Sequence, residues 1–427
     1  MNAAAGLQAV LAQQRRRVVA HLARSLGLSH LALAEDAVQA ASLRALEVWP
    51  AQGLPANPAG WLYRVARNEA IDALRVAGRH EPWPEDEDAA AAALPALQPA
   101  EGRFSGELDD EELALLFAAC HPTLPAASQV AVALRALAGL DLATIAAGLL
   151  CSEAALAQRL VRAREQIARE QLRLPAGHEL APRRDAVLTA LSLAFHAGAR
   201  ARTRAADSDA RRDATTLCWE AIRLARALAA HPAAAHAEAD ALAAMLLLHG
   251  ARLSGQLDEA GDIVLLPGQP RDRWDAGMVR MGLAHLQAAQ RATHLSRWHL
   301  LAGIAAEHAT APDHARTDWA TIAHYYGWLV DLDPSAAPRL GHAIALAEAG
   351  APQVALERLR AMQAGVPAAL RPHALAAMAR ARERLGDTDE ALKLLGQAAD
   401  AAPHAADARA LRRRAEAIRS ARADPAP

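Results

Sequence analysis

No stretch of this chain alternates Val, Ile and Thr with polar residues over several positions, which is the pattern of a half-buried β-strand. Hydrophobic residues make up 53% of the sequence but aromatic residues only 3%, because alanine and leucine dominate. Both residues favour helix by intrinsic propensity. At 427 residues the chain also exceeds one ordinary hydrophobic core. We therefore expect an all-α protein of two or three domains.

Charge is unevenly distributed, although the net charge is only −2. Residues 7–78 hold eight arginines against five acids, and residues 79–107 hold seven acids against two arginines. Neither segment is basic enough to indicate nucleic-acid binding by charge alone. An argument for DNA binding must therefore depend on motifs.

The three cysteines, Cys120, Cys151 and Cys218, are far apart and form no C-x-x-C pair. This spacing argues against a disulfide framework or a zinc ribbon and is typical of a reducing cytoplasm. The N-terminus lacks the pattern of a signal peptide, and no run of about eighteen apolar residues is free of charge. We expect a soluble, cytoplasmic protein that does not enter a membrane.

The first expected domain covers residues 7–78. Periodicity predicts three helices, at 7–26, 31–49 and 58–78. Pro50 is expected to end the second helix, because a proline cannot continue the hydrogen-bond ladder. Asn57 is expected to cap the third helix, whose first position, Pro58, is the preferred place for proline.

Residues 79–107 form an acidic linker with no periodic apolar face, and we expect it to be mobile. The second domain, 108–175, is expected to contain three helices. The last two, at 141–150 and 152–173, are separated by almost nothing, and Ser152 is a good N-cap. Two abutting helices joined by a tight turn indicate a helix-turn-helix.

Helices of similar length, separated by Pro and Gly, fill the third domain, 182–420. Gly350 and Gly386 are 36 residues apart, and Ala355, Leu359 and Pro367 recur at the same offset. A helical repeat near this length, with small residues where paired helices touch, resembles a tetratricopeptide repeat. We therefore predict a repeat-like helical extension, most clearly over 340–403.

The segment 61–75 carries the strongest functional signal. Its polar residues recur every three or four positions and so share one helical face: Arg64, Arg67, Asn68, Asp72 and Arg75. Apolar residues occupy the opposite face. Such a polar face suits phosphates and exposed base edges. On spacing alone, however, an ordinary surface helix with local pairs, Asp72 with Arg75 or Arg64 with Asn68, is the better explanation.

The sequence of this segment resembles the promoter-melting helix of region 2 in extracytoplasmic-function sigma factors, W-L-x-x-x-A-R-N-x-x-I-D-x-x-R. The resemblance implies −10 DNA contacts by Trp61, Arg64, Arg67, Asn68, Asp72 and Arg75, with Trp61 either stacking on a base or packing in the core. Upstream, Ala34-Glu-Asp-Ala-Val-Gln39 is similar to the family helix that docks on the β′ clamp helices of RNA polymerase.

That second resemblance assigns Glu35, Asp36 and Gln39 to polymerase binding. The chain departs from the family just afterwards, where an acid and a bulky aromatic residue are replaced by Ala40 and Ser42. The departure implies a weaker clamp contact, or packing that shifts onto Leu43 and Trp49.

Residues 141–164 are similar to sigma region 4, whose recognition helix enters the major groove of the −35 element. The resemblance places Ser152, Glu153, Ala154 and Gln158 nearest the bases and Arg159, Arg162 and Arg164 on phosphates. Ala155 stands where many relatives have Thr, which removes one hydroxyl contact. An ordinary helical hairpin is the alternative interpretation of this segment.

The phrase Cys120-His121-Pro122 indicates packing and a helix stop rather than a metal site, because no second ligand pair accompanies it. It also occurs in a sigma subgroup with a long helical C-terminal extension. Trp274-Asp275 and Thr317-Asp-Trp319 resemble the same subgroup. The chain departs from it at Phe195-His-Ala-Gly-Ala199, where relatives carry a polar, aromatic-rich phrase.

No pattern in the sequence indicates an enzyme. The histidines form no H-E-x-x-H motif, and there is neither a phosphate-binding glycine loop nor a Ser/His/Asp arrangement. We predict no metal and no cofactor. Packing explains the tryptophans of the extension better than a ligand cage; these are Trp219, Trp274, Trp298, Trp319 and Trp328.

Together these resemblances imply an alternative sigma factor whose partners are core RNA polymerase, through the β′ clamp helices and β flap, and promoter DNA. The extension is expected to bind protein, either within the chain or as the site of an external regulator. The alternative hypothesis is a protein-binding scaffold with a sigma-like half that no longer initiates transcription. Ala40, Ser42 and Ala155 keep this alternative open.

Overall fold

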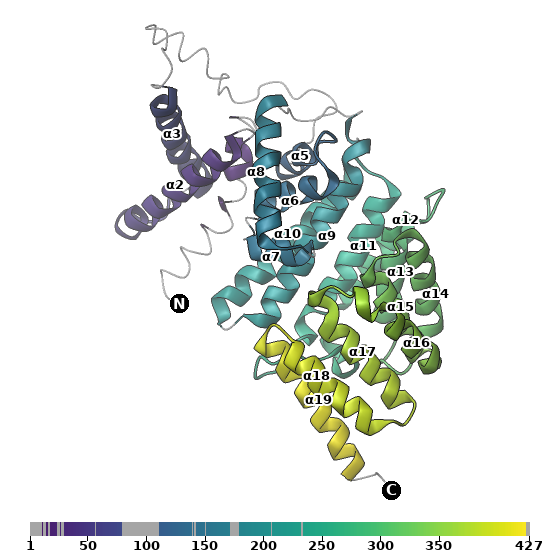
Figure 1. Ribbon diagram of the computed structural model, residues 1–427. Helices are drawn as coiled ribbons and strands as arrows, with labels where there is room; N and C mark the ends of the chain where they lie inside the picture. Colours follow the sequence, from purple (N-terminus) through teal and green to yellow (C-terminus); the bar gives the residue numbers. More distant parts are fainter. Residues whose placement is uncertain are drawn as a thin grey trace. The chain divides into compact units, whose positions relative to one another are not determined.

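The protein is described by a computed structural model, drawn in Figure 1. It describes residues 30–55, 57–78, 111–138, 140, 142–149, 151–170, 179–205, 207–231 and 234–423, with scattered positions from 11 to 26. Its regular structure is helical, apart from one isolated antiparallel bridge between Leu257 and Ile263. The all-α prediction is confirmed. The predicted linker 79–107 lies outside the described residues.

Contacts divide the chain into two compact units. We call Met1–Ala194 with Ala230–Ala234 the N-terminal unit, and Phe195–Ala229 with Ala235–Pro427 the C-terminal unit. The division falls inside one helix, α9 (Arg184–Arg204). The sequence placed a domain start near residue 182, and that boundary stays a prediction.

The first helical hairpin is formed by α2 (Leu31–Gln52) and α3 (Pro58–Gly78). The prediction that Pro50 ends this helix is wrong: α2 continues to Gln52. A proline in the last turn removes only one ladder hydrogen bond. The helix ends instead at Gly53, whose φ of 84° favours glycine. Asn57 caps α3 as predicted: its Oδ1 accepts from the backbone N–H of Gly60 at 2.9 Å.

Within the described residues 111–170, four helices follow: α5 (Glu111–Ala119), α6 (Ala126–Ala138), α7 (Leu142–Gly148) and α8 (Glu153–Glu170). The sequence predicted three, because it missed a break between α5 and α6. Pro122 and Pro125 lie in that break and cannot donate to a continuing ladder. The chain bends by 101° between α7 and α8, and Ser152 caps α8 by accepting from the Ala155 N–H at 3.3 Å.

Within the N-terminal unit, Arg183 anchors the turn before α9 to the end of α5. It lies in a short 3-10 turn before α9, and only 2% of its surface is exposed. Its guanidinium Nη1 donates to the carbonyl of Phe117, in the last turn of α5, at 3.0 Å. A cation at this position also complements the negative end of α5. Nothing in the local sequence predicted this contact, since 66 residues separate the two partners.

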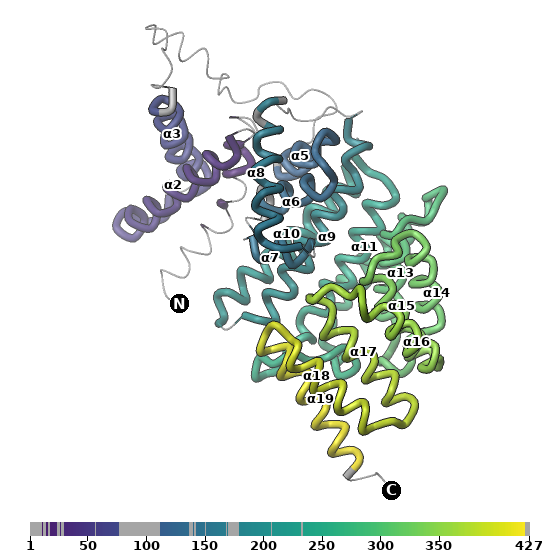
Figure 2. Tube along the Cα trace, viewed as in Figure 1, coloured from purple at the N-terminus to yellow at the C-terminus, as the bar shows by residue number. Residues whose placement is uncertain are grey.

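The remaining helices are α10 (Ser208–Ala230), α11 (Ala237–Ala251), α12 (Ala276–Ala289), α13 (Arg297–Thr310), α14 (Trp319–Leu332), α15 (Ala336–Glu348), α16 (Pro352–Met362), α17 (Arg371–Arg384), α18 (Thr388–Ala401) and α19 (Ala405–Ala423). Consecutive helices from α11 onward pack in chain order, as the colour gradient of Figure 2 shows. Most of α11 is buried between α12 and α13.

The repeat seen in the sequence has a structural counterpart. Gly350 and Gly386 both adopt positive φ, at 91° and 79°, in the turn that joins two helices of a hairpin. Ala355 and Ala391 are both fully buried one turn into the following helix. The hairpins α15–α16 and α17–α18 therefore share their turn and their closest helix contact. Their identification as tetratricopeptide repeats stays a prediction.

Two of the five extension tryptophans do not pack as predicted. Trp274, Trp298 and Trp319 are buried, but Trp219 is 42% exposed and Trp328 is 43% exposed. Both exposed rings lie on helices, on α10 and α14. Their exposure leaves them available for a contact outside the core.

The last helix, α19, is joined by ion pairs to earlier parts of the C-terminal unit. Arg413 binds Asp258 at 3.1 Å and Asp262 at 2.9 Å, and Arg409 binds Asp262 at 3.2 Å. These contacts link residues about 150 apart in the sequence. Within the described part of the chain, no single helix is long and apolar enough to cross a membrane; the bent pair α7–α8 passes only in combination.

Candidate nucleic-acid interface

Helix α3 separates its polar and apolar residues as the sequence predicted. Leu62, Ala66 and Ala70 are fully buried against the rest of the N-terminal unit. The opposite face presents Arg64, Asn68, Asp72 and Arg75 to solvent, with Arg67 half-buried beside them. Because these positions are three or four residues apart, five of the six predicted −10 residues share one surface. We call this surface the α3 polar face.

Few ion pairs or hydrogen bonds join the side chains of the α3 polar face to one another. Asp72 and Arg75 form an ion pair at 3.7 Å, but both side chains are about 70% exposed, and such a pair contributes little. Among the described residues, Arg64 and Arg67 make no ion pair, and Arg64 makes no hydrogen bond to Asn68. Two guanidinium groups are therefore available to an anionic ligand.

Trp61 packs within the protein. Its ring meets the buried ring of Trp49 edge to face, with centroids 5.3 Å apart and an angle of 67°. This contact fixes the start of α3 against the end of α2. Of the two roles that the sequence left open for Trp61, the structure shows packing.

The predicted polymerase-binding residues of α2 are not all on one surface. Asp36 and Gln39 are exposed and one turn apart, whereas Glu35 is half-buried and lies 3.9 Å from Arg135 of α6. Burial raises the pKa of the Glu35 carboxyl, opposed by the nearby charges of Arg135 and Arg164. Asp36 and Gln39 alone form an open contact surface.

Residues after Gln39 show what replaces the aromatic residue of the family. The Ser42 hydroxyl donates to the Val38 carbonyl at 2.7 Å, so it is used inside the helix. One expectation from the sequence is that packing shifts onto Leu43 and Trp49. Trp49 is buried, but Leu43 is 57% exposed. Leu43 therefore does not take over the packing.

Helix α8 presents its N-terminal residues to solvent. Ser152, Glu153, Ala154 and Gln158 are all exposed. The opposite side buries Leu156, Leu160, Ala163 and Ile167. The first two turns of α8 thus have the free surface that a recognition helix needs.

The three predicted phosphate-binding arginines of α8 do not act as one group. Arg159 and Arg162 are one turn apart, and the Arg162 Nε donates to the Gln158 carbonyl at 3.4 Å. Arg164 is on another side of the helix, where it lines a small cavity of about 40 Å³ together with Leu31 and Arg135. The spacing 159, 162, 164 could have revealed this split, since a shift of two residues turns a helix by about 200°.

Cys120 and His121 show the predicted packing role. Cys120 is fully buried, and burial raises the pKa of its thiol. The His121 Nδ1 lies 2.8 Å from the Thr123 hydroxyl in the turn after α5. No group of three metal-binding side chains occurs among the residues that the structure describes.

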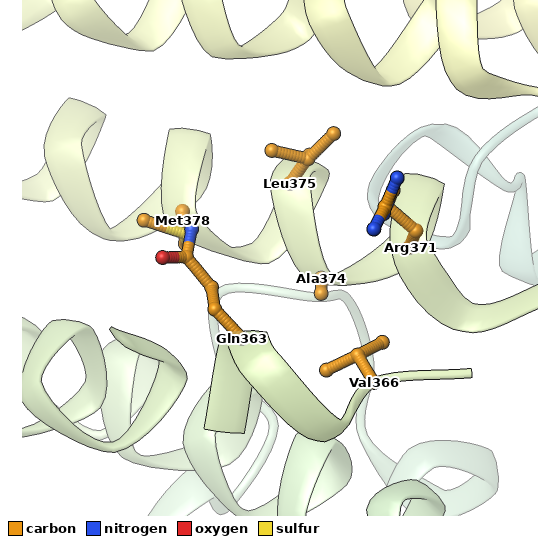
Figure 3. Close-up of a pocket in the computed structure, with 6 residues that line it drawn as sticks. All are labelled: Gln363, Val366, Arg371, Ala374, Leu375 and Met378. Carbon is orange, nitrogen blue, oxygen red and sulfur yellow. The ribbon is translucent and has the colours of Figure 1, made fainter. Parts of the chain in front are cut away.

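A pocket of about 270 Å³ opens between the end of α16 and the start of α17 (Figure 3). Gln363 lies beside Met378 on one side, and its amide donates to the Met378 sulfur at 3.4 Å. Arg371 stands on the other side as the one charged group of the lining. A single cation above an apolar wall offers no acid–base or nucleophilic pair.

Sequence reasoning missed one polar cluster. Asp240 of α11 is buried and accepts from His285 at 2.8 Å and from Arg291 at 2.5 Å. The partners are 45 and 51 residues apart, so no local spacing signals the contact. The cluster satisfies a buried carboxylate and joins α11 to α12.

Comparison with known proteins shows what this chain is similar to. Residues 11–80 match the sigma-70 region 2 family, and residues 183–290 match a family of unknown function, DUF6596. The uncharacterized protein R00370 of Rhizobium meliloti (strain 1021) is 37% identical over 334 residues, which cover 77% of this chain and 76% of that protein. No solved structure matches significantly.

The region 2 match contains α2, α3 and the α3 polar face. The chain therefore contains a sigma-70 region 2 domain, which indicates a member of the sigma-70 family of transcription regulators. More narrowly, it belongs with the Rhizobium meliloti protein in one family that shares an extension beyond region 2.

Proposed function

We propose that this protein is an alternative sigma factor that directs core RNA polymerase to a specific set of promoters. One observation carries the proposal: within the segment matched by sigma-70 region 2, the α3 polar face is exposed and Arg64 and Arg67 make no ion pair among the described residues. A helix this well packed on its other face gains nothing structurally from unpaired cations. They are suited to DNA phosphates.

In this proposal α3 opens the −10 element. Arg64, Arg67 and Arg75 hold the freed strand electrostatically, and Asn68 contacts an unstacked base through its amide. Trp61 fixes the start of α3 by its edge-to-face contact with Trp49. Because Trp61 is engaged in that contact, base capture falls to the polar residues one and two turns further along α3.

The same proposal assigns the −35 element to α7 and α8. Their 101° bend lies within the range of helix-turn-helix pairs. Glu153, Ala154 and Gln158 would enter the major groove, and Arg159 and Arg162 would hold phosphates. Arg164 is exposed too, but it lies on another side of α8, beside Leu31 and Arg135.

Polymerase binding would begin at Asp36 and Gln39, the exposed pair on α2. Glu35 can join them only if its contact with Arg135 opens. We therefore infer that the clamp contact of this chain is narrower than the three-residue set implied by the family.

For the extension we propose a built-in regulatory module that binds protein. The stacked hairpins α15–α16 and α17–α18 support this idea, because stacked helical hairpins present extended protein-binding surfaces. The contact of Arg183 with Phe117 lies within the N-terminal unit, where it is an anchor for the start of α9. A truncation after Arg204 keeps this anchor and the whole of α9. Promoter-specific transcription that is unchanged by the truncation, in rate and in response, would exclude a regulatory role.

A second candidate function has specific support: a protein-binding scaffold whose sigma-like half does not initiate transcription. The Ser42 hydroxyl is consumed inside α2, and Ala155 is exposed where a hydroxyl would reach DNA. Both features weaken the expected contacts.

One experiment separates the two functions. The purified full-length chain is mixed with core polymerase and assayed for association and for run-off transcription on genomic DNA. We expect association and new, specific start sites. No association with core polymerase would favour the scaffold.

A further inference from the structure

An apolar groove on the C-terminal unit surrounds one of the two exposed tryptophans. Its volume is about 530 Å³, and α10, α11 and α12 line it with Trp219, Ile222, Arg223, Arg226, Ala227, Leu247, Met278 and Met281. Ile222, Leu247 and Met278 form a buried floor, while Trp219 and Met281 stand exposed at the walls, at 42% and 39%. We call it the Trp219 groove.

Gly250 of α11 sets the depth of the Trp219 groove. A Cβ at this position would come within 2.7 Å of the Met278 side chain, 2.8 Å of Ile222 and 3.4 Å of the Trp219 ring. The absence of a side chain lets these three residues converge on α11. The depth of the groove therefore depends on Gly250, and the Trp219 indole packs against this glycine.

Charge around the groove is positive. Glu220 pairs with Arg223 at 2.8 Å, which neutralises one arginine. Arg226, the second arginine of the lining, is exposed and makes no ion pair within the described residues. The lining thus offers one free guanidinium group, beside the paired Arg223, next to an apolar floor.

From this arrangement we infer that the Trp219 groove binds an acidic amphipathic helix of a partner protein. The inference deepens the proposed role of the extension as a protein-binding module, and it rests on that role. The α10 wall residues are spaced 219, 222, 223 and 226, so the wall spans about two helical turns. An apolar stripe of matching length fills such a groove, and a flanking carboxylate meets Arg226.

Nucleic acid fits the same surface poorly. Its phosphates would meet the two arginines, but nothing in a duplex would cover Ile222, Leu247 and Met278. A buried aromatic anchor with a charged rim is the usual composition of a protein-binding hot spot.

The test uses the full-length chain and synthetic peptides of about 18 residues, or about five helical turns. One peptide carries Leu on one helical face and Glu beside it; the second replaces every Glu by Lys, and the third replaces every Leu by Ala. Binding is measured by fluorescence anisotropy. We expect the first peptide to bind at least about tenfold more tightly than either of the others.

Four variants locate the site. Trp219→Ala and Arg226→Glu should each weaken binding of the acidic peptide about tenfold. Trp328→Ala removes an equally exposed indole elsewhere and Arg371→Glu reverses a charge in another pocket, so both should bind like the wild type. Equal losses in Trp328→Ala, equal binding of the Lys peptide, or no binding of the acidic peptide would overturn the inference.

The outcome is separable from the sigma proposal, because core-polymerase association is measured on the same preparation. A chain that associates with core polymerase but ignores the acidic peptide refutes the groove alone. A chain that binds the peptide at Trp219 but not the polymerase refutes the sigma role alone. Binding of a DNA duplex that Trp219→Ala abolishes would assign the groove to the wrong class of partner.

Discussion

Two pairs of arginines, one pair in each compact unit, have opposite surroundings. On α3 of the N-terminal unit, Arg64 and Arg67 make no ion pair among the described residues. In the C-terminal unit, Arg380 and Arg384 both bind Glu348, which is only 4% exposed and comes from the neighbouring hairpin. The comparison separates two uses of one residue type. Paired arginines join helices, and unpaired arginines on a well-packed helix await a ligand.

The largest expected effect is at Glu348. Although burial opposes it, hydrogen bonds from Arg380 and Arg384 hold the pKa of Glu348 below its ordinary value. Glu348→Ala removes the buried carboxylate that two guanidinium groups share, which leaves Arg384 without an ion pair among the described residues and Arg380 with Glu383 alone. We therefore expect a loss of about 3 kcal/mol in the free energy of unfolding. Urea denaturation measures it. Glu348→Gln, which keeps the shape, should lose less, and equal stability of wild type and Glu348→Ala would refute a joining role.

Acid should destabilise the C-terminal unit through buried histidines. Burial lowers the pKa of His196 to about 4 and that of His308 to about 3. Both are neutral when folded, whereas the unfolded chain binds protons near pH 6.5. Stability is therefore full above about pH 6.5 and falls as the pH drops toward 4, by up to about 1.4 kcal/mol per pH unit for each histidine.

Thermal melts between pH 7.5 and pH 4.5 check this expectation. His308→Phe should flatten the dependence, because it removes one of the buried histidines that must take up a proton on unfolding while keeping a ring. A melting temperature that rises on acidification would contradict the burial of these rings as neutral groups.

Substitutions on the α3 polar face should affect function and not stability, the opposite of what we expect at Glu348. Arg64→Ala and Arg67→Ala should change the free energy of unfolding by less than about 0.5 kcal/mol. Under the proposed function, each should reduce promoter opening about tenfold, or about 1.4 kcal/mol. 2-Aminopurine fluorescence in the −10 element reports opening, and a variant that lost stability but not opening would place these arginines in the fold instead.

Ion pairs of α19 should give a smaller, salt-dependent effect. Arg413→Ala removes two contacts, to Asp258 and Asp262. The side chains are partly exposed, so we expect about 1 kcal/mol or less, screened further by salt. Hydrogen exchange of α19 should rise in this variant and, for the wild type, in high salt. Exchange that is insensitive to both would show that the ion pairs do not hold the helix.

The smallest effect belongs to the exposed pair on α3. Asp72→Ala breaks only the 3.7 Å contact with Arg75, so stability should change by no more than about 0.5 kcal/mol. A larger loss in chemical denaturation would mean that the α3 polar face stabilises itself.

Local sequence patterns predicted the parts of the fold that local interactions determine. The caps at Asn57 and Ser152 involve bonds over three residues, and both are confirmed. The two faces of α3 follow from a spacing of three and four. The positive-φ glycines 350 and 386 were visible as a 36-residue offset.

Long-range contacts could not be predicted in this way. Arg183 looks like a surface residue in the sequence, yet it is buried against Phe117, 66 residues away. Glu35 looked available beside Asp36, but a residue one position away lies on another side of the helix and meets Arg135. The exposure of Trp219 depends on how three helices meet around Gly250. Propensity and periodicity describe single helices and carry no information about which helices meet.

The most direct test of the sigma role is whether polymerase that contains this chain melts DNA. Core polymerase with the full-length protein is bound to a promoter identified by run-off transcription, and unpaired thymines are mapped with permanganate. The account predicts reactive thymines around the −10 element that disappear in the Arg64→Ala/Arg67→Ala double variant. Polymerase that binds the chain but shows no reactive thymines at any start site, or a double variant with an unchanged pattern, would contradict it.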